Sequence, residues 1–374
     1  MKKVIICFCV GFALLIQINS LAQTADKKAT KETKNLLANL HKQAGKGILF
    51  GHQDDLAYGV GWKYEAGRSD VKETTGQFPA VYGWELGRIE IDAPVNLDGV
   101  PFDKMKQFIA TAYESGSVVT ISWHLNNPLT GKTAWEPAPG TVEAVLPGGE
   151  KNELYISWLD KVAAFMLDLK GKHGEYIPVI FRPFHELNGS WLWWGKNHCT
   201  LEEVKQLYRF TETYLEDTKN VHNLLYAYNT DRFATSEDYL ERYPGDDYVD
   251  VIGFDIYQKG DILANDKFIA EIDKSLSLIE KIAGSKNKIA ALTEFGYNTL
   301  PDAQWWSGVL AKALEKHTIA YALAWRNAGQ KSKNESEFYV PYKGQLSAAD
   351  FKKFSMINTM IFEKKVKTKK LYSK

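Results

Sequence analysis

The stretch Ile177–Gly195, IPVIFRPFHELNGSWLWWG, decides how the rest of this chain is interpreted. Its apolar, β-branched beginning, Ile177 to Phe181, predicts a buried strand, which we expect to extend to Glu186. The strand ends in Arg182-Pro-Phe-His-Glu186, a run rich in ionisable side chains, at the point where the chain leaves the core. The pattern therefore predicts a core strand that delivers polar groups to one edge of a sheet.

The tryptophans after this strand indicate what its polar end does. Trp191, Trp193 and Trp194 follow Glu186 closely. Desolvation among aromatic rings raises the pKa of a carboxyl group, and flat aromatic faces stack on sugar rings. The combination indicates a general acid placed against a carbohydrate. The alternative for an isolated Glu is a solvated side chain beside surface aromatics, and the neighbouring residues disfavour it.

The overall composition is that of an ordinary globular protein. The chain has 374 residues with a formal net charge of zero, 45% hydrophobic and 25% charged residues. This balance gives no reason to expect nucleic acid or a membrane as a partner, and we expect a monomer. Aromatic residues make up 13% and include 11 Trp, which is more than packing alone requires.

The N-terminus has the pattern of a cleavable signal peptide over residues 1–22. Met1-Lys-Lys3 is positively charged, residues 4–16 are apolar, and Ser20-Leu-Ala22 offers small residues two apart before a cut at Gln23. The apolar run is too short to span a membrane as a helix. We therefore expect the chain to be exported.

The cysteines refine this expectation. No Cys follows Ala22, where a lipoprotein signal would require one, so we predict a released periplasmic or secreted protein. Residues 23–374 are then one domain. Cys199 is its only cysteine, which excludes an intramolecular disulfide.

Short apolar runs alternate with helical patterns along the chain. Strands are predicted over 47–53, 80–85, 117–124, 177–186, 223–229, 250–257, 288–294 and 319–326. Helices are predicted over 36–43, 102–115, 153–172, 201–219, 267–283, 302–316 and 347–362. The segments 126–149 and 327–346 are expected to be loops that can close a cleft. Alternation of this kind favours a parallel sheet with helices outside it, and eight strands favour a closed (β/α)8 TIM barrel of the α/β class. No glycine fingerprint for a dinucleotide follows the first strand, which argues against an open doubly wound sheet.

The ends of the predicted strands carry polar or ionisable side chains. These are His52, Glu85, His124, Glu186, Asn229, Tyr257, Glu294 and Arg326. In a TIM barrel the chemistry lies at the C-terminal ends of the strands. Glu186 and Glu294 end the fourth and seventh strands, so they should face each other across the mouth of the barrel. A retaining glycosidase needs two carboxyl groups roughly 5–5.5 Å apart, and this arrangement is compatible with that distance.

Several motifs together resemble glycoside hydrolase family 26, the β-mannanase family. They are Arg182-Pro-Phe-His-Glu-Leu-Asn-Gly-Ser-Trp191 with Trp193-Trp-Gly195, Leu292-Thr-Glu-Phe-Gly296, Ile121-Ser-Trp-His124, the segment 243–257 and Ala324-Trp-Arg326. The resemblance extends from about Lys46 to Arg326. The motif around Glu186 is specific, and the others gain weight from their order.

The resemblance implies a role for each matching residue. Glu186 would be the acid/base and Glu294 the nucleophile of a retaining enzyme. His185 would bond near the nucleophile or the sugar's 2-position, and Tyr257 would orient Glu294. His124, Trp325 and Arg326 match positions around the sugar that is cleaved, and Trp191 matches an aromatic platform on the leaving-group side. No cofactor is implied.

Structural alternatives stay open for several of these residues. The alternative for His124 is a core histidine, for Arg326 an ion-pair partner, and for Trp193 and Trp194 supports of the loop. Glu85 and His52 are either lining of a distal sugar site or buried hydrogen-bonding groups. Trp62, Trp123, Trp135, Trp305 and Trp306 are candidate platforms that the sequence does not separate.

The resemblance therefore predicts a retaining endo-β-1,4-mannanase that acts on mannan, glucomannan, galactomannan or manno-oligosaccharides. Same-family activity on mixed-linkage β-glucan or β-1,3-xylan remains an alternative, as does a non-catalytic glycan-binding protein on a barrel scaffold. No metal is expected, because the histidines have neither HExxH spacing nor a Cys partner, and no GxSxG motif offers a serine nucleophile.

Overall fold

The computed structural model describes residues 23–373. The signal peptide predicted over residues 1–22 lies outside this part of the chain, so the prediction is not tested by it.

Eight parallel strands form a closed barrel within the described residues. Each strand pairs with the next in chain order, and β10 pairs back to β1. The barrel strands are β1 (Ile48–Gln53), β4 (Val81–Glu85), β5 (Val118–Ser122), β6 (Val179–Arg182), β7 (Leu224–Thr230), β8 (Val251–Gln258), β9 (Ile289–Tyr297) and β10 (Tyr321–Ala324). The predicted single-domain (β/α)8 barrel is confirmed.

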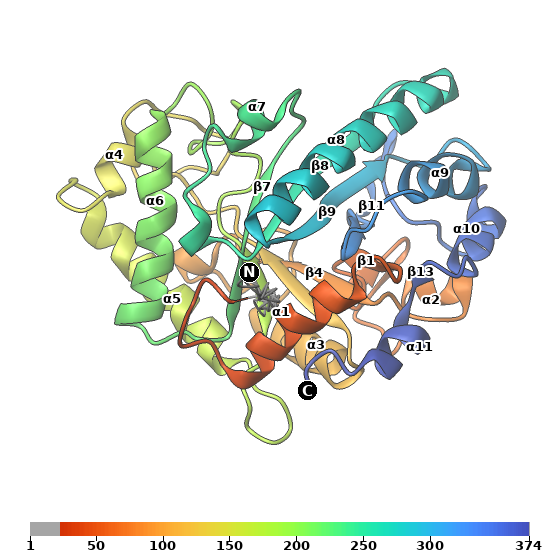
Figure 1. Cartoon of the computed structure of the whole chain (residues 1–374), viewed down its shortest axis with the longest axis horizontal. Helices are drawn as coiled ribbons and strands as arrows, with labels where there is room; N and C mark the ends of the chain where they lie inside the picture. The colour runs from red at the N-terminus through yellow and green to blue at the C-terminus, as the bar shows by residue number, and fades with distance from the viewer. Residues whose placement is uncertain (1–22, 374) are drawn as a thin grey trace, which may run out of the picture.

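Helices cover the outside of the barrel, as Figure 1 shows. They are α1 (Lys31–Gln43), α2 (Asp70–Thr75), α3 (Phe102–Glu114), α4 (Thr141–Val145), α5 (Asn152–Asp168), α6 (Leu201–Thr213), α7 (Ser236–Leu240), α8 (Asn265–Lys286), α9 (Ala311–Leu314), α10 (Ala348–Ser355) and α11 (Glu363–Val366). π-helical turns extend α6 (Tyr214–Thr218) and precede α9 (Trp306–Leu310), and short 3-10 turns cover Ile89–Ile91, Asp246–Tyr248, Ile262–Ala264 and Lys367–Lys369. No helix in residues 23–373 has the length and apolar character needed to cross a membrane.

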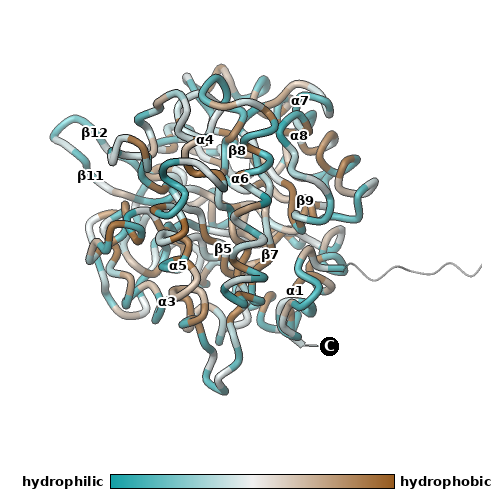
Figure 2. The backbone as a smooth tube through the Cα atoms, turned by 90° about the vertical axis from the view of Figure 1, so that its left-hand side faces the viewer, coloured by the Kyte–Doolittle hydropathy of each residue, from teal (hydrophilic) through white to brown (hydrophobic). Residues whose placement is uncertain are grey.

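Two short hairpins stand on the rim of the barrel. The first pairs β2 (Tyr58–Gly59) with β3 (Trp62–Lys63), and the second pairs β11 (Gly329–Ser332) with β12 (Glu335–Glu337). The second lies within the predicted 327–346 loop and projects as a hydrophilic tip in Figure 2.

Apolar side chains fill the barrel interior up to the C-terminal ends of its strands. Ile180, Ala227 and Val251 belong to one buried cluster inside the strands. Successive residues of a strand point to opposite faces, so the next inward positions on β6 and β7 belong to Arg182 and Asn229. The apolar core is thus topped by a polar layer at the C-terminal ends of the strands.

Several predicted elements differ from the structure, among them the loop expected over 126–149, which contains α4, and two of the differences have a clear physical cause. The fourth strand was expected over 177–186, but β6 ends at Arg182, because Pro183 has no N–H to continue the ladder. The helix expected over 347–362 ends at Ser355. Beyond it, β13 (Met360–Ile361) adds to the edge of β1, and the Ile48 N–H donates to the Thr359 carbonyl at 2.7 Å.

Candidate active site

Glu186 lies in the turn that follows β6. Its φ of +52° is in the left-handed region, which few residues other than glycine adopt, and such strain is found where surrounding contacts impose it. Asn188 ties this turn to the loop after β7, since its side chain accepts from the Asp231 N–H and donates to the Arg232 carbonyl. The turn therefore holds the Glu186 side chain over the mouth of the barrel.

Glu294 lies inside the mouth, on β9. Simple alternation after Ala291 would turn Thr293 inward, but the pairing of β8 with β9 shifts register just before Glu294. Such a bulge re-aims the side chain that follows it. The Glu294 carboxylate accepts from Arg182 Nη2 at 2.6 Å and from the Tyr257 hydroxyl at 2.6 Å. Both oxygens are thus fixed by one donor each.

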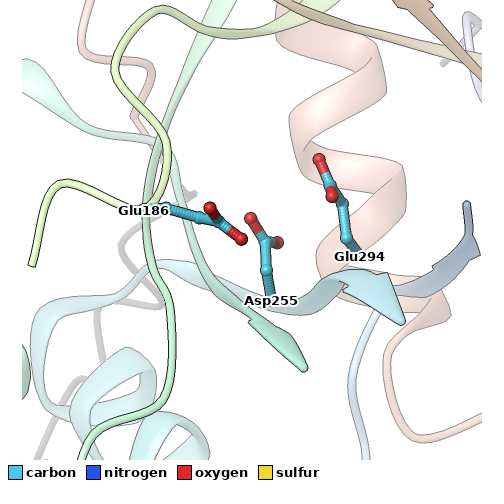
Figure 3. A group of neighbouring side chains, drawn as sticks. All are labelled: Glu186, Asp255 and Glu294. Atoms are coloured by element: carbon cyan, nitrogen blue, oxygen red, sulfur yellow. The ribbon is translucent and has the colours of Figure 1, made fainter. Parts of the chain in front are cut away.

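The two glutamates meet beside a third carboxyl group. Carboxylate oxygens of Glu186, Asp255 and Glu294 all lie within 4.8 Å of one another, and Figure 3 shows the three groups facing a common space. This proximity fits the separation of roughly 5–5.5 Å in retaining glycosidases and is shorter than the 6.5–9.5 Å of inverting ones.

The environment of Glu186 suits a proton donor. Burial, followed by the charges of Glu294 and Asp231, raises the pKa of Glu186 to about 7. The Trp191 indole N–H donates to Glu186 Oε2 at 2.6 Å, which stabilises the charged form and limits this rise in pKa. Gly189 lies beneath the Trp191 ring, where a side chain would collide with it. Glu186 can therefore hold a proton near neutral pH.

Three buried side chains, Glu85, His124 and His185, form a hydrogen-bonded relay beside this site. Glu85 accepts from the Ser122 hydroxyl, the backbone N–H groups of Gly87 and His124, and His124 Nδ1. His124 Nε2 lies 2.9 Å from His185 Nε2.

Charge alternates along this relay. Burial alone would raise the pKa of Glu85, but the His124 ring and its hydrogen bonds lower it. Burial would lower the pKa of His124, and Glu85 reverses the effect and raises it. Burial and the neighbouring His124 hold the pKa of His185 well below its usual value. His124 is thus the charged partner of Glu85. His185 is a neutral ring that accepts a hydrogen bond from His124.

A pocket of about 430 Å³ opens above the relay. It is lined by Leu97, Asp98, His124, Trp135, Tyr257, Trp325, Arg326, Glu337 and Tyr339. Arg326 is held by Asp98, with Nε 3.2 Å from Oδ1, and by Glu337, with Nη2 3.2 Å from Oε1. The ion-pair alternative for Arg326 is therefore correct, and the same residue also forms part of the pocket wall.

The structure brings the residues predicted from the resemblance to one place. His124, Tyr257, Trp325 and Arg326 line the pocket, while His185 lies beneath His124 and Trp191 flanks Glu186. Glu85 and His52 do not line it. His52 is buried against Asp55, with Nδ1 2.7 Å from Oδ1.

The remaining tryptophans divide by exposure. Seven are buried and serve packing, namely Trp84, Trp123, Trp158, Trp193, Trp194, Trp305 and Trp306. Trp62 is also buried, but it lines a smaller pocket beside Asp98 and Arg326. Trp135, on the predicted 126–149 loop, is 46% exposed and stacks on His124 with ring centroids 4.8 Å apart. Trp135 is therefore a second exposed aromatic face in the cleft, besides Trp191.

Sequence reasoning missed several members of the site. Asp98, Glu337 and Tyr339 lie outside the barrel strands and carry no motif. Asp255 had a usable signal, because it precedes Tyr257 by two residues and must point to the same face of β8.

The three central carboxyl groups are also, among residues 23–373, the one set of acidic, His or Cys side chains spaced as a metal site would be. The Arg182 guanidinium already supplies positive charge to Glu294 and lies 3.6 Å from Asp255. We therefore assign no metal to them.

Comparison of the chain with known proteins identifies related sequences and structures. The profile of glycosyl hydrolase family 26 matches residues 25–333. A mannan endo-1,4-beta-mannosidase of Bifidobacterium adolescentis is 37% identical over 91% of this chain, which spans only 35% of that protein's length. A protein of the same name from Bacillus subtilis strain 168 is 26% identical, with 83% of this chain and 82% of that protein aligned.

Solved structures agree with the sequence comparisons. A GH26 beta-mannanase from Bacteroides ovatus has 44% identity and a TM-score of 0.85, covering 89% of this chain and 95% of the other. The catalytic domain of an endo-beta-1,4-mannanase from Bacillus sp. JAMB-750 has 33% identity and a TM-score of 0.86, covering 94% and 96%.

Proposed function

We propose that this chain, which belongs to glycosyl hydrolase family 26, is a retaining endo-β-1,4-mannanase. The observation that carries the proposal is the pair of facing carboxyl groups, Glu186 and Glu294, with oxygens within 4.8 Å and a pKa of Glu186 near 7. The names of the relatives supply the substrate class, a β-1,4-linked mannan.

In the first step Glu294 attacks the anomeric carbon of the bound sugar. The Tyr257 hydroxyl and Arg182 each bind one oxygen of Glu294, so the nucleophile is fixed in place beside a positive charge. Glu186 gives its proton to the departing glycosidic oxygen, and the sugar becomes covalently attached to Glu294. Two easier barriers replace one high barrier.

In the second step water releases the sugar. Glu186, now ionised, takes a proton from the water that attacks the anomeric carbon, and Glu294 leaves. Once Glu294 is esterified its negative charge is gone, which removes one of the causes that raise the pKa of Glu186. The same residue is therefore an acid in the first step and a base in the second.

The pocket residues bind the sugars on either side of the bond. The neutral His185 ring and the charged His124 offer polar contacts beneath the reacting sugar, and Trp325 and Arg326 form the opposite part of the wall. Trp191, 39% exposed beside Glu186, presents an aromatic face on the leaving-group side. The substrates are mannan, glucomannan, galactomannan or manno-oligosaccharides.

The proposal includes the location and boundaries inferred from the sequence. Residues 1–22 would direct export and be removed, so that the catalytic domain 23–374 acts as a monomer in the periplasm or outside the cell. N-terminal sequencing of the protein purified from its host would test the cut before Gln23.

Product analysis tests the activity. Anion-exchange chromatography would follow digests of β-mannan, mixed-linkage β-glucan and xylan by wild type, Glu294→Ala and Glu186→Ala, with Glu202→Ala on the exposed face of α6 as a matched control. Oligosaccharides from mannan alone, lost in the two site variants and kept in the control, are expected. Products from glucan or xylan instead would change the substrate, and binding without products would contradict an enzyme.

A further inference from the structure

Asp255 is the buried carboxyl group that the two-glutamate mechanism does not use. It lies on β8 with no exposed surface, opposite Glu294 on β9. Its Oδ2 accepts from Asn229 Nδ2 at 2.7 Å, and Asn229 Oδ1 accepts from Arg182 Nη1 at 3.2 Å. The other oxygen, Oδ1, is buried and has no hydrogen-bond partner among the described residues.

The charges around Asp255 do not balance if it is ionised. From the neighbouring elements it faces Glu186 after β6, Glu294 on β9 and the guanidinium of Arg182 on β6. Arg182 is already engaged at 2.6 Å by Glu294, against 3.6 Å to Asp255. A second buried negative charge would therefore be left without an adequate counter-charge, which is strongly unfavourable.

The other polar groups nearby do not supply that counter-charge. Tyr257 donates its hydroxyl to Glu294, and the Tyr321 hydroxyl on β10 is neutral at working pH, since burial raises its pKa. The Thr293 hydroxyl on β9 lowers the pKa of Asp255 by less than burial raises it, and being neutral it supplies no counter-charge. A carboxylic acid, by contrast, would use both of its oxygens here. Oδ2 accepts from Asn229, and a hydroxyl on Oδ1 would be a donor within the carboxylate cluster, where an Asp255 oxygen lies within 4.8 Å of oxygens of both glutamates.

We propose that Asp255 is a positioning residue that stays protonated through the reaction and directs its O–H toward the Glu186–Glu294 pair. The proposal rests on the function proposed above. A separation of up to 4.8 Å suits a bridging water as well as a closer approach when substrate is bound. The Asp255 proton keeps the site at one negative charge, balanced by Arg182, while Glu186 loses and regains its own proton. Desolvation, followed by the charge of Glu294, raises the pKa of Asp255 well above its usual value, which agrees with this arrangement.

The test compares Asp255→Asn with Asp255→Ala. The Asn amide reproduces the protonated acid, with one acceptor toward Asn229 and one N–H donor toward the glutamates. We expect Asp255→Ala to lower kcat at least tenfold and Asp255→Asn to recover most of that loss. The alkaline limb of the kcat/KM profile, which reports Glu186, should lie within about 0.3 pH units of wild type in Asp255→Asn.

An ionised Asp255 predicts a different result. Removing a unit charge within 4.8 Å of Glu186 would lower that limb by about 2.5 pH units at an effective dielectric constant near 20. Such a shift, or equal losses in the Asn and Ala variants, would overturn the proposal.

A second readout does not depend on activity. At a pH well above the titration of Glu186, infrared spectra of wild type should contain a carbonyl stretch of a protonated carboxyl group that Asp255→Asn lacks. Its absence would overturn the protonated state even if the enzyme is active. An inactive wild type that shows the band would contradict the proposed function and leave the protonation of Asp255 supported.

Discussion

The hydrogen bond from Trp191 to Glu186 leads to a prediction that can be worked in detail. In Trp191→Phe the aromatic face remains and the indole N–H is lost. The N–H lies 2.6 Å from Glu186 Oε2 and stabilises the ionised form, so its removal favours the protonated form and raises the pKa of Glu186. A hydrogen bond to a charged group contributes about 1.5–3 kcal/mol, and the exposure of Trp191 reduces that to about 1 kcal/mol. This corresponds to roughly 0.7 pH units.

The assay is the pH dependence of kcat/KM on a soluble manno-oligosaccharide. Its alkaline limb reports the deprotonation of the acid in the free enzyme, which has its midpoint at about 7 in wild type. Trp191→Phe should move this limb upward by roughly 0.7 pH units. Trp135→Phe is the matched control, because Trp135 lies in the same cleft and stacks on His124 without bonding Glu186. An unchanged or lower limb in Trp191→Phe, or the same rise in the control, would refute the reasoning.

Three further predictions concern other parts of the molecule. Tyr257→Phe removes the donor to Glu294 and should lower kcat by about 10- to 100-fold with little change in the melting temperature; steady-state kinetics that match wild type would contradict this. Arg182→Met leaves Glu294 buried without its counter-charge and should cost about 3–5 kcal/mol of unfolding free energy in urea titrations, whereas a cost below about 1 kcal/mol would show that the pair is not structural. Burial and the neighbouring Glu212 raise the pKa of Glu216 from 4.5 to about 10, so its contribution to stability is full below pH 4.5 and is lost as the pH rises toward 10. The melting temperature of Glu216→Gln should therefore fall less than that of wild type over this range, and parallel curves would exclude Glu216 as the cause.

The barrel was predictable because its signals are local. Each strand is a short apolar run followed by a polar residue, and eight such runs between helical patterns leave few alternatives to a closed parallel barrel. The predicted helix over 347–362 was wrong at its end. Met360 and Ile361 continue an apolar pattern, and the pattern does not reveal that they pair with β1.

The central pair was predictable from position, and its geometry was not. Their positions at the ends of predicted strands indicated that Glu186 and Glu294 lie close together. The positive φ of Glu186 and the register shift before Glu294, by contrast, depend on contacts between distant segments. The residues of the pocket wall were even harder to predict from the sequence. Asp98 and Glu337 reach Arg326 from loops whose paths no local pattern fixes.

The most direct test of the two-glutamate account is the configuration of the first product. Proton NMR would follow the anomeric signals during early hydrolysis of a β-1,4-linked manno-oligosaccharide by wild type and by Glu294→Ala. The account predicts that the β-anomer appears first in wild type and equilibrates later, and that Glu294→Ala releases no product. First release of the α-anomer, or turnover that survives in Glu294→Ala, would contradict it.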